Sequence, residues 1–308
     1  MIESQTKKKL NVLPNNPEQN VNPGSSRSGR FPSWLHRKIP KGKKQFKTNT
    51  ILEKYQLSTV CEEAKCPNRM ECFSKKTATF LALGKQCTRA CGFCDIDFSK
   101  TPKAPEEDEP IRIANSVQEL NLRHVVITMV ARDDLKDYGA SHIAQIIDKI
   151  REVNDAVTIE VLTSDFSGCE DSLNIVLNKK PEVFNHNIET VREISPRVRH
   201  SATYDRTLEV LSRAKQSNKC RYIKSGIMVG LGETFEQVQT TIQDLKDVGC
   251  DIITIGQYLQ ASRLKLRVKE FVTPETFKEY ESFGKSINVK HMYCGPFVRS
   301  SYNASLFI

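Results

Sequence analysis

The chain has 308 residues, of which 38% are hydrophobic and 27% are charged, a composition typical of a soluble globular protein. No apolar run approaches the roughly 20 residues that a membrane-spanning helix needs, and the N-terminus lacks the apolar stretch of a secretory signal. Ten cysteines in a chain without an export signal favour metal binding over disulfides, so we expect a cytoplasmic protein without a membrane span.

The net charge of +9 belongs to the first 50 residues. They hold eleven Lys and Arg against Glu3 and Glu18, whereas the rest of the chain has 35 residues of each sign. Residues 1–30 also lack a hydrophobic period, and we expect them to form a disordered basic arm. Such an arm is either a solvated tail or a segment that binds an acidic macromolecule electrostatically. Aromatic side chains that stack on bases are sparse there, which favours an acidic protein over nucleic acid.

Two sets of three closely spaced cysteines are the most distinctive feature. The first triad is Cys61, Cys66 and Cys72, spaced C-x4-C-x5-C, and the second triad is Cys87, Cys91 and Cys94, spaced C-x3-C-x2-C. A structural zinc site needs four ligands, usually as two C-x2-C pairs, and only one such pair occurs here. Two iron–sulfur clusters, each with one iron that lacks a thiolate from its triad, explain the pattern best. A zinc knot and free core cysteines are the alternatives.

From residue 77 onward, apolar and β-branched runs alternate with helical patterns. We expect strands over 77–83, 124–130, 157–163, 182–188, 222–230 and 252–259. We expect helices over 111–122, 139–153, 170–179, 204–217, 234–248 and 274–288, and a short one over 49–60. This alternation predicts a parallel sheet covered by helices. No G-x-G-x-x-G follows the first strand, so we favour a partial (β/α)6 TIM-like barrel over an open doubly wound sheet.

The barrel, with its N-terminal and C-terminal extensions, divides the chain into four parts. They are the arm (1–30), an N-terminal extension with the first triad (31–76), the barrel (77–290) and a C-terminal extension (291–308). Parallel α/β folds place their chemistry at the carboxyl ends of the strands, where we expect Thr128, Asn187 and Glu189. Asn187, Lys224 and Gln257 interrupt apolar runs, and such polar residues are costly to bury without partners. Gly230-x-Gly232 is a weak signal for a phosphate loop.

The second triad, with Phe93 before its last cysteine, resembles the signature of the radical S-adenosylmethionine (SAM) superfamily. In that superfamily the three cysteines hold a [4Fe–4S] cluster whose open iron binds SAM. The remaining motifs resemble one family within it, the lipoyl synthases. These are the first triad, Phe184-Asn-His-Asn-Ile-Glu189-Thr190, Ser225-Gly-Ile-Met-Val-Gly-Leu-Gly-Glu233, Gly256-Gln-Tyr-Leu-Gln260 and Cys294-Gly-Pro-Phe-Val-Arg299-Ser-Ser-Tyr302. The resemblance runs from about Phe31 to Ala304.

The resemblance implies a sulfur-inserting enzyme with two [4Fe–4S] clusters and SAM. It implies that Cys87, Cys91 and Cys94 hold the cluster that cleaves SAM, and that the first triad with Ser301 holds an auxiliary cluster that donates sulfur. Sulfur would enter at C6 and C8 of an octanoyl-lysine, which gives the lipoyl group. We expect Phe93, Thr128, Asn187 and Glu189 to contact SAM, and Arg132 and Asp134 to orient the substrate lysine or the arm.

The implied partners are an acidic octanoylated carrier domain or protein, a reductant such as flavodoxin or ferredoxin, and an iron–sulfur cluster repair carrier. Another sulfur-inserting radical SAM enzyme, a two-cluster electron carrier and a zinc-stabilised nucleic-acid binder are the competing interpretations. Four residues depart from the family pattern: Ala131, Lys136, Tyr138 and Ala261. The cysteines outside the triads, Cys169, Cys220, Cys250 and Cys294, are expected to be plain and mostly buried thiols.

Overall fold

The computed structural model describes residues 31–36, 44–75, 78–302 and 304. The arm that we expect to be disordered, residues 1–30, lies outside the described residues. Within the described part, no helix combines the length and the apolar character that crossing a membrane requires.

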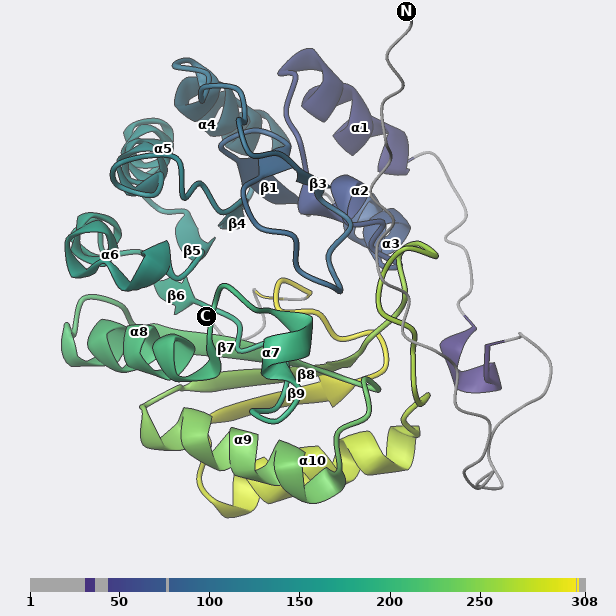
Figure 1. Cartoon of the computed structure of the whole chain (residues 1–308). Coiled ribbons are helices and arrows are strands. Elements are labelled where there is room, and N and C mark those ends of the chain that lie inside the picture. The colour runs from purple at the N-terminus through teal and green to yellow at the C-terminus, as the bar shows by residue number, and fades with distance from the viewer. Residues whose placement is uncertain (1–30, 37–43, 76–77, 303, 305–308) are drawn as a thin grey trace, which may run out of the picture.

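One sheet of seven parallel strands forms the centre of the molecule, in the order β1-β4-β5-β6-β7-β8-β9. Its strands are β1 (Thr79–Ala82), β4 (His124–Met129), β5 (Thr158–Leu162), β6 (Val183–Asn185), β7 (Tyr222–Val229), β8 (Ile252–Gln257) and β9 (His291–Gly295). The two end strands, β1 and β9, do not pair with each other, so the curved sheet is a partial barrel, as predicted (Figure 1). The first six of these strands match the predicted ones.

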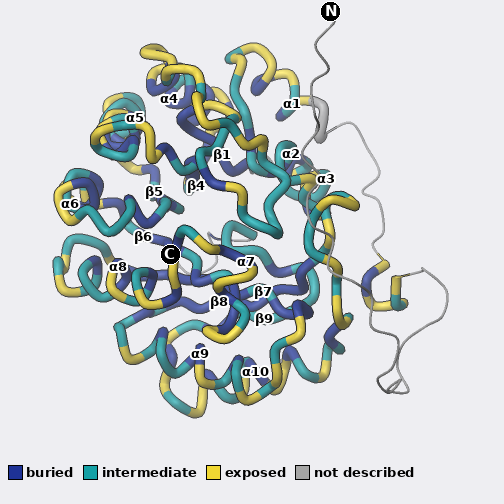
Figure 2. Tube along the Cα trace, in the orientation of Figure 1, coloured by how far each residue is buried: buried dark blue, intermediate teal, exposed yellow. Residues whose placement is uncertain are grey.

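Six long helices cover the outside of the sheet (Figure 1). They are α4 (Glu109–Leu120), α5 (Ala140–Val153), α6 (Glu170–Leu177), α8 (Tyr204–Gln216), α9 (Phe235–Asp247) and α10 (Pro274–Ser286). Threonines define several starts: Thr203, Thr234 and Thr273 each accept a hydrogen bond from a first-turn N–H. The core lies between these helices and the strands, whose residues, those of β9 apart, are almost all buried (Figure 2).

The remaining elements are the 11-residue helix α1 and several short ones. They are η1 (Ser33–Leu35), α1 (Lys44–Lys54), α2 (Val60–Glu63), α3 (Arg69–Ser74), η2 (Phe166–Gly168), α7 (Ser195–Val198) and the paired β2 (Gln86–Cys87) and β3 (Asp97–Phe98). The parallel pairing of β2 with β3 closes the loop that carries the second triad.

Two predicted boundaries were wrong. The helix expected over 49–60 is α1, which ends at Lys54 because Gln56 adopts a left-handed backbone conformation (φ 49°). Residues 291–295, which we assigned to the C-terminal extension, form a seventh strand of the sheet. Its sequence, His-Met-Tyr-Cys-Gly, contains no continuous apolar run, and only Met292 is fully buried, so the usual signal of a central strand is missing.

A buried ion pair lies in the interior of the barrel. Lys224 of β7 donates to both carboxylate oxygens of Glu160 on β5 at 3.0 Å, and Asn185 of β6 donates to the same carboxylate at 2.8 Å. Both charged side chains are only 1% exposed. Because side chains alternate along a strand, Leu162 and Met228 share the faces of Glu160 and Lys224, closer to the carboxyl ends. Both line the cavity described below, so the ion pair supports its floor.

Candidate active site

A single cavity of about 490 Å³ opens at the carboxyl ends of the strands. It is lined by all six cysteines of the two triads, by Phe93, Thr128, Asn187 and Glu189, and by Arg299, Ser300 and Ser301. Every residue that the sequence predicted to hold a cluster or to contact SAM therefore borders the same space. Their individual roles remain predictions.

The second triad lies on the loop between β2 and β3. The N–H of Ser99 donates to the carbonyl of Cys87 at 2.9 Å, which fixes the two ends of this loop together. Burial raises the pKa of Cys91 to about 12 and that of Cys94 to about 11, and the neighbouring thiols of the triad add to the effect. Metal ligation requires thiolates, so a cluster that binds here displaces protons held tightly by the free protein.

The first triad lies on the short helices α2 and α3. The side chain of Thr59 caps α2 and the chain turns at Cys66-Pro67, which brings Cys61, Cys66 and Cys72 to one wall of the cavity. Burial raises the pKa of Cys61 to about 11 and that of Cys72 to about 12. Within the described part of the chain, no three His, Cys, Asp or Glu side chains are placed to share one metal ion.

The C-terminal segment, residues 296–302, closes the cavity beside the first triad. Asn68, between two cysteines of that triad, donates to the carbonyl of Phe297 at 2.7 Å, and the Tyr302 hydroxyl donates to Glu71 at 2.9 Å. The segment also passes so close to β8 that a Cβ on Gly256 would lie 2.0 Å from the Val298 carbonyl. Glycine at 256 is therefore needed for Ser301 to reach the cavity.

Strand ends deliver the polar groups that we predicted to contact SAM. Asn187 follows β6 and donates to the Ser300 hydroxyl at 3.2 Å, while its own Oδ1 is buried without a partner among the described residues. The hydroxyl of Thr163, after β5, is likewise buried and unpartnered at the cavity wall. Asn187 Oδ1 and the Thr163 hydroxyl are thus two buried acceptors without donors, in the cavity that the three thiols also line. A ligand with an amino group would supply the missing donors. The residues present therefore fit an iron–sulfur cluster with SAM.

Glu189 is held in an unusual backbone conformation at the cavity wall. Its φ of 69° lies in the left-handed region, and bonds to β7 fix it: its N–H donates to Gly226 at 2.9 Å, and its carbonyl accepts from Met228 at 2.7 Å. Such strain persists only where surrounding structure imposes it. Burial raises the pKa of Glu189, and the buried guanidinium of Arg199 offsets part of that effect.

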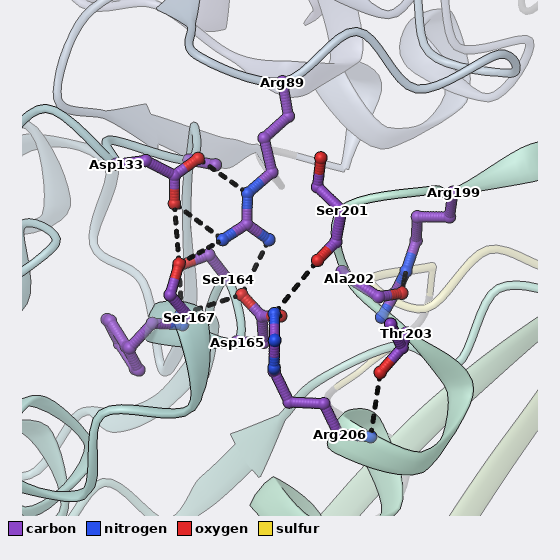
Figure 3. A network of polar contacts seen from close by, with 12 residues as sticks. Arg89, Asp133, Ser164, Asp165, Ser167, Arg199, Ser201, Ala202, Thr203 and Arg206 are labelled. Atoms are coloured by element: carbon purple, nitrogen blue, oxygen red, sulfur yellow. Dashed lines mark hydrogen bonds and ion pairs between the residues drawn. The ribbon is translucent and has the colours of Figure 1, made fainter. Parts of the chain in front are cut away.

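An ionic network, which the sequence did not reveal, ties the second triad to the strand ends. Arg89, inside the triad, donates to both oxygens of Asp133 at 2.7 and 2.8 Å and pairs with Asp165 at 2.6 Å. Arg206 reaches the other oxygen of Asp165 at 3.3 Å, and Ser167 bridges Arg89 and Asp133 (Figure 3). Burial alone raises the pKa of Asp165, but Arg89 outweighs it and holds that pKa below its usual range.

Arg199 is the second functional residue that sequence reasoning missed. Its guanidinium lines the cavity, donates to the backbone carbonyls of Asn187 and Ala202, and also contacts Thr207. No local motif distinguishes it from its neighbours in Pro196-Arg-Val-Arg199. Only the fold brings it beside Glu189.

Two other expectations need correction. Arg132 and Asp134 pair with each other at 2.8 Å, and Arg132 also donates to the Leu83 carbonyl; neither residue borders the cavity, so they do not orient a substrate lysine there. Among the cysteines outside the triads, Cys250 is buried as expected, but Cys169, Cys220 and Cys294 are only partly buried.

Comparison with known proteins agrees with this geometry. A model of the radical SAM superfamily matches residues 81–245, and a model of the N-terminal domain of lipoyl synthase matches residues 2–66. The fold resembles that of Streptococcus suis SuiB bound to S-adenosylmethionine (TM-score 0.58, 11% identity, 78% of this chain and 57% of that chain). It also resembles methylornithine synthase (TM-score 0.52, 13% identity, 85% and 87%). The chain belongs to the radical SAM superfamily.

Curated relatives define the family more narrowly. The lipoyl synthase of Protochlamydia amoebophila is 60% identical over 100% of this chain and 96% of its own length. The lipoyl synthase of Chlamydia felis is 50% identical over 94% and 93%. Within the superfamily, the chain is therefore a member of the lipoyl synthase family. It is a sulfur-inserting radical enzyme that uses [4Fe–4S] clusters and SAM.

Proposed function

We propose that the chain converts an octanoyl-lysine on a carrier protein into lipoyl-lysine, with sulfur inserted at C6 and C8. The observation that carries this proposal is the shared cavity, which both cysteine triads and Ser301 border. Each carbon that loses hydrogen must also receive sulfur, and a shared cavity holds the octanoyl chain between the two triads. Its volume lies within the roughly 300–1,000 Å³ of small-molecule sites.

Cys87, Cys91 and Cys94 are the proposed ligands of the cluster that works with SAM. When bound, this pair supplies a 5′-deoxyadenosyl radical able to take hydrogen from an unactivated carbon, which no protein acid or base can do. Phe93, Thr128, Asn187 and Glu189 border the space for SAM, and the free Oδ1 of Asn187 is suited to accept from its amino group. Apolar side chains such as Leu81 and Leu162 exclude water from the reacting carbon.

Cys61, Cys66 and Cys72, with Ser301, are the proposed ligands of the cluster that is consumed as the sulfur donor. Iron–sulfur clusters normally take thiolates, and a serine oxygen is a weaker match that leaves more readily. The C-terminal segment carries Ser301 to the first triad through Asn68 and Tyr302. The proposed role of Asn68 and Tyr302 is to position Ser301, a ligand that must later detach from the cluster.

The proposed substrate is an octanoylated carrier domain or protein with an acidic surface. The chemistry also requires an electron donor, for which flavodoxin or ferredoxin is suited, and a carrier that rebuilds the consumed cluster. We place the protein in the cytoplasm, where free thiols stay reduced; within the described residues, all ten cysteines are free.

Anaerobic reconstitution tests the proposal. The full chain is loaded with iron and sulfide, its iron content is measured, and SAM, dithionite and an octanoyl-lysine peptide are added. We expect about eight irons per chain from two four-iron clusters. We also expect 5′-deoxyadenosine and a peptide that gains two sulfur atoms, read by mass spectrometry.

The matched control is Cys61→Ala/Cys66→Ala/Cys72→Ala, which removes only the first triad. This variant should retain about half of the iron and should still cleave SAM, but should yield no sulfur-containing peptide. Two results with the wild-type protein would contradict the proposal. One is zinc bound in place of iron, and the other is SAM that stays uncleaved after dithionite is added.

A further inference from the structure

The loop after β8 has a rigidly held backbone. The N–H of Leu266 donates to Gly92 in the second triad at 2.9 Å, and that of Lys269 donates to Gly230 at 2.8 Å. The Tyr258 hydroxyl donates to the Leu266 carbonyl at 2.8 Å. Residues 263–269, hereafter the basic segment, are therefore fixed in place although they form no helix or strand.

The basic segment turns its apolar and cationic side chains in different directions. Leu266 and Val268 pack inward against an apolar cluster that includes Phe93. Arg263, Arg267 and Lys269 are exposed, and Lys265 is half-buried. Leu264 is 94% exposed, more than any other large hydrophobic side chain in the described part of the chain. The inward contacts fix the segment, and the outward face is left to solvent.

The four cations of the basic segment make no ion pair with any described residue. In the seven residues from Arg263 to Lys269 there is no acidic side chain. By contrast, Lys65 and Lys85, elsewhere on this side of the molecule, are each paired at 2.6 and 2.8 Å, with Asp95 and Glu63. A fixed cluster of unpaired cations around an exposed leucine matches a partner surface with carboxylates around an apolar spot.

The basic segment also stands at the cavity. Leu259, Gln260 and Ala261, immediately before it, line the cavity wall, and Ser262 donates to Asp95 at 2.9 Å, next to Cys94. A macromolecule that delivers a modified lysine into this cavity must cover the surrounding rim. The basic segment continues from this wall and is bonded to the second triad through Leu266 and Gly92.

We propose that the basic segment is the docking edge for the carrier protein, and that it binds an acidic face of the carrier while the octanoyl-lysine enters the cavity. This inference rests on the proposed function and names the surface that selects the substrate protein. Arg263 and Arg267 supply the charge, and Leu264 supplies the apolar contact. None of the three residues touches the reacting atoms.

The test compares one variant on two substrates. Arg263→Glu/Arg267→Glu is assayed with an octanoylated acidic carrier domain and with a short octanoyl-lysine peptide. We expect KM for the carrier to rise at least about tenfold at low salt, with kcat unchanged, because like charges then oppose docking. Turnover of the peptide should stay within about twofold of wild type. Fluorescence anisotropy of the labelled carrier measures the same loss as weaker binding, without turnover.

A matched charge reversal serves as the control. Arg123 and Lys290 are exposed cations that precede β4 and β9, at the opposite ends of the strands from the cavity. Arg123→Glu/Lys290→Glu changes the net charge by the same amount and should leave carrier binding unchanged. Added salt should weaken the binding of the carrier to wild type and to this control. The same addition should weaken its binding to Arg263→Glu/Arg267→Glu much less, because the attractive charges are already removed.

Three results would overturn the inference. Carrier binding that is unchanged in the variant, an equal loss of peptide turnover, or an equal loss in the control would each show that the basic segment is not a docking edge. Loss of duplex DNA binding with unchanged carrier binding would assign the segment to nucleic acid instead. If wild type converts neither carrier nor peptide, the proposed function itself is wrong.

Discussion

Arg89 and Asp165 form an ion pair of 2.6 Å between the second cysteine triad and the end of β5, with side chains 7% and 0% exposed. The pair joins a loop that has almost no regular structure to a strand of the barrel. Asp133 holds the opposite edge of the same guanidinium. Arg89 therefore ties the loop that carries the three thiols to the strand ends of the sheet.

Arg89→Lys should impair SAM cleavage while the protein remains folded. Lysine keeps the charge but cannot bridge two carboxylates with a planar fork, so the triad loop loses its fixed orientation. We expect the rate of 5′-deoxyadenosine formation to fall at least about tenfold, as misplaced reacting groups cost large factors. Arg221→Lys, on an exposed side chain remote from the cavity, is the control. A rate equal to wild type would show that the network does not position the triad.

Ser301→Ala should separate the two halves of the reaction. The thiols of the second triad, the proposed ligands of the cluster that works with SAM, are untouched, so 5′-deoxyadenosine should form at close to the wild-type rate. Sulfur insertion into the octanoyl peptide should fall at least about tenfold, because the first triad loses the proposed oxygen ligand that completes its site. Ser300→Ala removes the neighbouring hydroxyl, which accepts from Asn187, and is the control. Unchanged lipoyl formation in Ser301→Ala would remove this serine from the mechanism.

The buried pair of Glu160 and Lys224 makes a stability prediction. Lys224→Met leaves the Glu160 carboxylate buried with Asn185 as its remaining close donor, which should cost about 3–5 kcal/mol of unfolding free energy. Glu160→Gln/Lys224→Met removes both charges and should recover much of that loss. Urea unfolding of the cluster-free proteins measures both values. A double variant less stable than the single one would show that the pair itself stabilises the barrel.

His186 should make the protein sensitive to acid. Burial, aided by Arg199, lowers its pKa from 6.5 to about 4. Below pH 6.5 the unfolded chain therefore takes up a proton that the folded protein refuses until about pH 4, so this residue lowers stability as pH falls through that interval. A pKa difference of one unit corresponds to about 1.4 kcal/mol. His186→Gln should flatten the dependence between pH 6.5 and 4 in urea titrations of the cluster-free protein; an equally steep dependence would exclude His186 as its source.

Deletion of residues 1–30 tests the basic arm. We expect weaker binding of an acidic carrier at low salt and little difference at high salt, because the arm acts through screened charge. Anisotropy titrations of full-length and shortened protein at two salt concentrations measure this. Equal affinities at low salt would show that the arm is only a solvated tail. Combined with Arg263→Glu/Arg267→Glu, the deletion also shows whether arm and basic segment act independently.

The sequence predicted the barrel well because its signals are local. Apolar, β-branched runs and helical patterns mark strands and helices without knowledge of their neighbours, and the six predicted strands and six of the predicted helices were confirmed within a few residues. The strand β9 was not predicted because it is a half-buried end strand without an apolar run, and only its pairing with β8 defines it. Motif spacing likewise located the cysteines, which act as sets within a short stretch.

Residues whose partners are distant in sequence could not be found this way. Arg89 meets Asp165 across 76 positions only because the fold places the loop after β2 against the residues that follow β5. Arg132 showed the opposite failure: it stands in a polar stretch at a strand end, where site residues are expected, yet folds back on Asp134 and Leu83. Polarity at a strand end indicates the rim, but only packing decides which side chains face the cavity.

The bond from Asn68 to Phe297 spans 229 residues, and it has a consequence for how the protein is made. Chains fold from the N-terminus during synthesis, so the first triad leaves the ribosome long before the segment that covers it. Until residue 302 is released, those thiols stand on an open surface, accessible to cluster delivery and to oxidants alike. A chain that stops before residue 297 would have both triads and no closed cavity. Completion of the polypeptide is thus the last step in building the catalytic chamber.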